Sequence, residues 1–187
     1  MHAAEPSLSG LPFPNVLIGV GGGLLVLLLL TTLVTRFTNR YVPIEQRRSR
    51  WSLALYAVYL ALIAVLAASS FGSILRWGHM SGYALLTHMA AAGAFVFLLM
   101  LIAWLYLPHG RAVRRLETRW WLARWSAWTM VLASLVVIAS MLLCMLPLLD
   151  TVDMRRMIDV HRYAGLAVVA TAAMHAASLC YTRLGWR

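Results

Sequence analysis

Five long apolar runs dominate this chain and limit the folds open to it. They lie at residues 16–35, 52–75, 83–107, 126–149 and 160–181. A helix needs about 20 apolar residues to cross the hydrocarbon core of a bilayer, and each run is long enough. Because lipid offers no partners to backbone N–H and C=O groups, such runs fold as helices rather than as loops or open strands. The sequence therefore predicts an all-α integral membrane protein with five transmembrane helices.

The charged residues are too few to cover a water-soluble surface. They make up 12% of the 187 residues, whereas soluble proteins usually carry about 25%. All 16 basic residues are arginines, and they lie in the short segments between the apolar runs. This distribution is typical of contacts with lipid headgroups and argues against nucleic acid as a partner.

The arginines also predict an orientation. Twelve of them follow the first, third and fifth runs, and four lie on the opposite side. Under the positive-inside rule the richer side is cytoplasmic, which puts the N-terminus outside and the C-terminus inside a bacterial inner (cytoplasmic) membrane. The expected order is an external tail at 1–15, a first transmembrane helix at 16–35, a cytoplasmic Arg-rich loop at 36–50, a four-helix bundle at 51–183 and a cytoplasmic tail at 184–187.

The first run is expected to be a retained helix rather than a cleaved signal peptide. Residues 1–15 contain no Arg or Lys, and a signal peptide begins with a positive segment. A cluster of glycines within this run predicts close packing against another helix through small residues. The cluster consists of Gly19, Gly21, Gly22 and Gly23.

Three of the six histidines lie inside the predicted spans, where ionisable side chains are costly and indicate function. His161 and His175 are separated by nearly four helical turns, so they project from almost the same face, about 21 Å apart. His88 and His161 lie at similar depth, near the external ends of the third and fifth runs. Their imidazoles could bind one haem iron from opposite sides, an arrangement suited to electron transfer. Hydrogen-bonded packing between helices is the alternative role for these histidines.

The neighbours of these histidines fit a haem site. Ala92 and Gly165 each lie one helical turn after a histidine, on its own face, and leave room for a flat porphyrin. Arg162 lies at the external end of the fifth run. Its guanidinium could bind a haem propionate or reach lipid headgroups.

Two segments of the chain resemble a known family. Residues 159–165 (DVHRYAG), continuing to His175, resemble the last helix of the bacterial four-helix cytochrome b membrane subunits. This group includes the membrane subunits of formate dehydrogenase and nickel–iron hydrogenase. Residues 82–88 (GYALLTH) resemble its histidine-bearing second helix.

The resemblance covers residues 51–183 and implies a four-helix bundle that holds b-type haem. It implies His88 and His161 as axial ligands of an external-side haem and His175 as a ligand of a cytoplasmic-side haem. The chain departs from the family because its second run contains no histidine to complete the second haem. The number of haems, one or two, therefore stays open. Met100 and Met130 are alternative ligands, with apolar packing as their ordinary role.

The resemblance further implies a subunit of a larger oxidoreductase complex. Electrons would pass between a redox partner subunit on the external side and membrane quinone, with His79 and His175 as candidate quinone-site residues. The chain lacks a CxxC or CxxCH motif for an iron–sulfur cluster or covalent haem. The alternative function is a haem-free membrane anchor or assembly subunit. A small transporter is disfavoured because the spans contain almost no acidic residues.

Overall fold

The computed structural model describes residues 12–38, 50–106 and 121–183, and within these ranges all regular structure is helical. The elements are α1 (Phe13–Thr38), α2 (Arg50–Ala67), the π-helical segment η1 (Ala68–Gly72), α3 (Ser73–Trp77), α4 (Gly82–Tyr106), α5 (Trp121–Met145) and α6 (Thr151–Arg183). Because α2, η1 and α3 follow one another without a break, they form one span. The predicted all-α fold is confirmed, with five helical segments long and apolar enough to cross a membrane.

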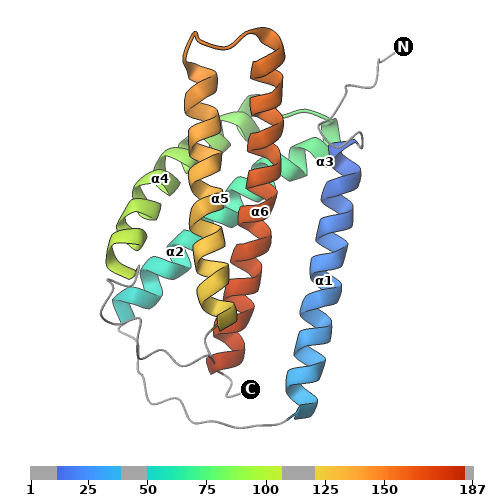
Figure 1. Ribbon diagram of the computed structural model, residues 1–187, viewed down its shortest axis with the longest axis vertical. Helices are drawn as coiled ribbons and strands as arrows, with labels where there is room; N and C mark the ends of the chain where they lie inside the picture. Colours follow the sequence, from blue (N-terminus) through green and yellow to red (C-terminus); the bar gives the residue numbers. More distant parts are fainter. Residues whose placement is uncertain (1–11, 39–49, 107–120, 184–187) are drawn as a thin grey trace.

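The helices form two packed pairs and one peripheral helix (Figure 1). α5 and α6 run side by side in opposite directions, and α2 packs against α4. The α2–α4 pair is tilted relative to α5 and α6, and it contacts this second pair mainly through α2 and α6. α1 stands outside the other helices and packs against α6. Of the five spans α1 has the smallest buried share, 6% compared with 11% to 17% for the others.

The centre of the four-helix part is filled by apolar and aromatic side chains. Tyr59 of α2 is fully buried and stacks on Phe95 of α4, with ring centroids 5.4 Å apart. The same cluster contains Ile63, Leu99, Met130, Val168 and Ala172. Such interlocking contacts hold membrane helices together, since lipid is as apolar as the side chains themselves.

α1 is attached to α6 at both of its ends. At one end, Phe13 and Leu17 pack with Leu166 in a second buried cluster. At the other end, the hydroxyl of Tyr181 lies 2.6 Å from Oγ1 of Thr32. α1 is therefore part of the fold even though most of its surface faces away from the other helices.

The glycine cluster of α1 does not make the close approach that the sequence suggested. Apart from the adjacent backbone of α1 itself, a Cβ atom placed on Gly19, Gly21, Gly22 or Gly23 would have no atom of the described chain within 4 Å. The prediction of close packing through these glycines is therefore wrong within this chain. The contacts of α1 are made instead by the larger side chains near its two ends.

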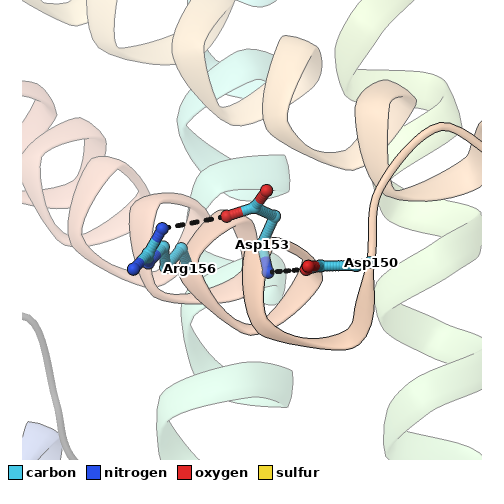
Figure 2. Close-up of polar contacts among 3 residues, drawn as sticks. All are labelled: Asp150, Asp153 and Arg156. Atoms are coloured by element: carbon cyan, nitrogen blue, oxygen red, sulfur yellow. Dashed lines mark hydrogen bonds and ion pairs between the residues drawn. The ribbon is translucent and has the colours of Figure 1, made fainter.

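α6 begins at Thr151, well before the apolar run expected at 160–181. The reason is a capped and charged first part (Figure 2). Oδ1 of Asp150 accepts a hydrogen bond from the backbone N–H of Asp153 at 2.7 Å, which satisfies one of the free donors at the helix start. Arg156 and Asp153 then form an ion pair at 3.0 Å. The apolar periodicity of the sequence detects only the later part of this helix.

Candidate functional site

His88 of α4 and His161 of α6 come together in the structure. Their ring centroids are 6.5 Å apart, and the ring planes make an angle of 75°. Both side chains are half-buried. From His161 to Tyr181 α6 rises about 30 Å, which is the thickness of a hydrocarbon core. The pair therefore lies in the half of the bundle where α4 and α6 begin, six residues into α4 and ten residues into α6.

The imidazole of His161 is held through its Nδ1 atom. Nδ1 lies 3.1 Å from the carbonyl oxygen of Val137 and 3.3 Å from Oγ of Ser140, both in α5. A carbonyl oxygen can only accept, so Nδ1 carries the proton and donates it. The lone pair then lies on Nε2, the atom that a neutral histidine would offer to a metal.

His88 is held in a similar way. Its Nδ1 lies 3.1 Å from Oγ of Ser69, which belongs to η1. The Ser69 hydroxyl donates to the carbonyl oxygen of Leu66 at 3.1 Å, and its single hydrogen is thereby used. Nδ1 of His88 is therefore the donor to Ser69, which leaves the lone pair on Nε2. Among the described residues no hydrogen bond to Nε2 of either histidine is found.

The spacing of the two rings fits an iron between them. A metal–imidazole bond is about 2.0 Å long and Nε2 lies about 1.1 Å from the ring centroid, so two axial imidazoles of one haem place their centroids about 6.2 Å apart. The observed separation is 6.5 Å. The two rings therefore stand at the distance that axial ligation requires.

The histidine pair supplies two nitrogen donors. Within the described ranges no group of three or more His, Cys, Asp or Glu side chains could hold a metal ion. Protein zinc sites use three or four protein ligands. A haem iron already has four porphyrin nitrogens and needs only two axial ligands, which a histidine pair supplies.

The small residues beside the histidines meet different surroundings. Ala92 is half-buried one turn after His88. At Gly165, a Cβ atom would lie 4.0 Å from Cζ of Phe71, an ordinary contact. Phe71 of η1 therefore limits the space that Gly165 leaves beside His161.

Arg162 lies at the outer end of the site, but its charge already has a partner. Its guanidinium is 3.5 Å from a carboxylate oxygen of Asp159 and 5.9 Å from the ring centroid of Phe13. A haem propionate at this position would compete with Asp159 for the same guanidinium. Arg162 is thus near the site but is not a cation reserved for a ligand.

His175 lies in the other half of the bundle, about 21 Å along α6 from His161. Its Nδ1 is 3.0 Å from Oγ of Ser126 in α5. The ring meets Tyr56 of α2 edge-on, with centroids 5.7 Å apart. The described residues therefore place a phenol, and not a second imidazole, opposite His175.

This second position does not fit an axial pair. A histidine and a tyrosine bound to one iron would hold their centroids about 7 Å apart or more, since the phenol oxygen projects beyond its ring. The observed 5.7 Å is a direct ring contact. Of the two candidate methionines, Met100 is 68% exposed, whereas Met130 is 4% exposed and belongs to the buried cluster around Tyr59.

His79 is separate from both positions. It is exposed in the short segment between α3 and α4, where its Nδ1 lies 3.0 Å from the carbonyl oxygen of Trp77. His79 and His175 therefore do not share a site. His2 and His109 lie outside the described residues.

Three serines that the apolar pattern does not single out hold the histidines. Ser69, Ser126 and Ser140 each lie in an apolar span, and each contacts a histidine of a neighbouring helix. Hydroxyl groups inside membrane spans commonly bond across helices. A search for such residues at the depth of each histidine could have found them.

No protein-family model, no curated protein and no solved structure matches this chain significantly. The assignment of function therefore depends on the residues and geometry described above.

Proposed function

We propose that this chain is a membrane cytochrome b subunit that holds one b-type haem between His88 and His161. The observation that carries this proposal is the pair of imidazoles, with centroids 6.5 Å apart and with both Nδ1 atoms engaged by neighbouring helices. Metal-binding histidines are usually fixed in this way through their second nitrogen. The resemblance of residues 51–183 to the four-helix cytochrome b subunits agrees with this assignment.

The bound haem would supply an iron that alternates between the ferric and ferrous states and so carries one electron at a time. His88 and His161 would hold the haem iron, and two histidine ligands favour electron transfer over oxygen binding. The surrounding apolar side chains would keep water from the iron. The site would thus pass electrons without exchanging ligands.

The electron donor and acceptor would be a redox partner subunit on the external side and membrane quinone. The histidine pair lies in the half of the bundle where α4 and α6 begin, so a protein docked on that side would approach it more closely than one docked on the other side. In the other half of the bundle, His175, Ser126 and Tyr56 form a polar cluster. Imidazole and phenol groups can form hydrogen bonds with a quinone and can transfer protons to it or from it. This cluster is therefore the first candidate quinone site, and the exposed His79 is the second.

The proposed location is the bacterial inner membrane, with the N-terminus outside and the C-terminus inside. The distribution of arginines supports this orientation. The chain would form one part of a larger oxidoreductase complex, whose substrate is determined by another subunit.

Substitution of the two ligands tests the proposal. His88→Ala and His161→Ala should each abolish haem binding in chain purified in detergent, because each removes one of the two protein ligands that would hold the iron. His79→Ala is the matched control, since this histidine is exposed and distant from the pair, and it should retain the full haem content. Retention of haem and an unchanged spectrum in both ligand variants would show that these histidines are not the ligands.

A further inference from the structure

The hydrogen bonds behind the two histidines follow one pattern. In η1, the hydroxyl of Ser69 donates to the carbonyl oxygen of Leu66, three residues earlier, and faces Nδ1 of His88. In α5, the hydroxyl of Ser140 donates at 2.9 Å to the carbonyl oxygen of Val137, also three residues earlier, and faces Nδ1 of His161. The same relay of carbonyl, serine and imidazole thus occurs on both sides of the site.

The direction of each relay follows from the bond that each serine donates to a backbone carbonyl. Serine has one hydroxyl hydrogen and gives it to the carbonyl, so its oxygen accepts from the imidazole N–H. Both rings are therefore held with the proton on Nδ1 and the lone pair on Nε2. Since the two serines come from different helices, this arrangement depends on the packing of η1 against α4 and of α5 against α6.

The π-helical segment contributes to one of these relays. Ser69 and Phe71 both belong to η1; Ser69 contacts His88, and Phe71 lies beside Gly165 of α6. Short π-helical segments within α-helices occur frequently at functional sites. Here the segment directs Ser69 toward His88 and Phe71 toward Gly165, one turn after His161.

We infer that Ser69 and Ser140 are positioning residues that fix the tautomer and orientation of the two axial histidines and lower the reduction potential of the bound haem. A hydrogen bond accepted from Nδ1–H makes the imidazole a stronger donor at Nε2. A stronger donor stabilises ferric iron more than ferrous iron, so loss of the bond raises the potential. This inference rests on the proposed haem site, and it adds residues that act through the ligands.

The two serines are not equivalent. His161 has the Val137 carbonyl at 3.1 Å, closer than Ser140 at 3.3 Å, and this carbonyl stays when the serine is replaced. At His88, Oγ of Ser69 lies 3.1 Å from Nδ1 of the histidine. We therefore expect Ser69→Ala to have a larger effect than Ser140→Ala.

The test compares these serines, which contact a histidine, with nearby serines that make the same kind of bond to a backbone carbonyl and have no histidine among their described hydrogen-bond partners. Ser70→Ala is the control for η1, because Ser70 donates to the same Leu66 carbonyl at 2.7 Å. Ser134→Ala is the control for α5, because its buried hydroxyl donates to Met130 at 2.7 Å. Ser69→Thr retains a hydroxyl and should restore the property that Ser69→Ala loses.

The measurements are the midpoint potential, the low-spin electron paramagnetic resonance signal and the haem content of each purified variant. Replacement of a residue that hydrogen-bonds to a metal ligand typically costs 10- to 100-fold in metal affinity. If Ser69→Ala weakens ferric haem binding tenfold more than ferrous binding, the midpoint potential rises by about 59 mV for one electron. Loss of haem in Ser69→Ala with full haem in Ser70→Ala and Ser69→Thr would equally support the inference.

Two results would overturn it, and they differ in meaning. An unchanged potential and signal in Ser69→Ala and Ser140→Ala, with wild-type haem content, would remove the positioning role and leave the haem site intact. Equal shifts in the control variants would have the same consequence. A wild-type chain without haem would instead contradict the proposed function, and the inference with it.

Discussion

Removal of the Tyr181 hydroxyl should weaken the attachment of α1 to α6. This hydroxyl lies 2.6 Å from Oγ1 of Thr32 and 3.2 Å from the carbonyl oxygen of Leu28, and it shares its one hydrogen between these two acceptors. The Thr32 hydroxyl itself donates to the Leu28 carbonyl at 2.6 Å. Tyr181→Phe therefore removes the donor from a hydrogen-bonded group that joins two helices.

The size of the effect follows from the number of bonds and their environment. Hydrogen bonds between side chains of membrane helices average about 0.6 kcal/mol and reach about 1.7 kcal/mol. Tyrosine has one hydroxyl hydrogen, and the 2.6 Å contact is short, so we expect a coupling of about 1 kcal/mol between Tyr181 and Thr32. This changes the equilibrium constant for docking of α1 roughly fivefold.

A double-mutant cycle of Tyr181→Phe and Thr32→Val, measured by reversible unfolding in mixed detergent micelles, gives this coupling directly. Thr171→Val is the matched control, because the Thr171 hydroxyl donates to Ala167 of its own helix, and it should show no coupling to Tyr181→Phe. Additive effects of Tyr181→Phe and Thr32→Val, within about 0.3 kcal/mol, would refute the reasoning.

Three further predictions concern the core and the site. Phe95→Ala should lower the free energy of unfolding by about 3 kcal/mol, because the Phe95 ring is only 4% exposed and stacks on Tyr59. Phe97 is 77% exposed, so Phe97→Ala should change the free energy of unfolding by less than about 0.5 kcal/mol. Equal losses for the two variants in the same unfolding assay would contradict this prediction. His175→Ala should retain the full haem content, measured as pyridine haemochrome per chain, because no second imidazole lies opposite it among the described residues; a halved content would indicate a second haem. Gly165→Ala should preserve the haem content, because a Cβ atom makes only an ordinary contact with Phe71 at 4.0 Å. Gly165→Leu should reduce the haem content, because the larger side chain fills space beside His161. Full haem content in Gly165→Leu would show that the haem does not use this space.

Hydrophobicity determines the number and position of the spans, and these could be predicted. Each apolar run corresponds to one helical segment, because the bilayer enforces both length and backbone hydrogen bonding. The start of α6 could not be found in this way. Its first part is held by the Asp150 cap and the Arg156–Asp153 ion pair, which do not depend on an apolar pattern.

The meeting of His88 and His161 could be anticipated because they lie at the same depth on two helices that run in the same direction. The hydrogen bonds behind them could not, because they depend on which helices become neighbours. Ser69 contacts His88 through η1, and no simple sequence pattern indicates a π-helical segment. The phenol of Tyr56 opposite His175 likewise results from the packing of α2 near α6.

The glycines of α1 show the limit of arguments from composition. Small residues permit close helix packing, but they do not create it. Phe13 and Leu17 pack against α6 at one end of α1, and the hydroxyl of Thr32 contacts Tyr181 of α6 near the other end. In the glycine-rich middle, a Cβ atom added at Gly21 or Gly22 would have no atom of the described chain within 4 Å apart from the adjacent backbone of α1 itself.

The most direct test of the central claim is the difference spectrum of the purified wild-type chain, dithionite-reduced minus oxidised, with the haem quantified as pyridine haemochrome. The chain should be produced with an adequate supply of haem. We predict sharp bands of low-spin b-type haem and one haem per chain, as expected for a single bis-histidine site at His88 and His161. A colourless protein would contradict this assignment and leave a haem-free membrane anchor as the better explanation of the fold.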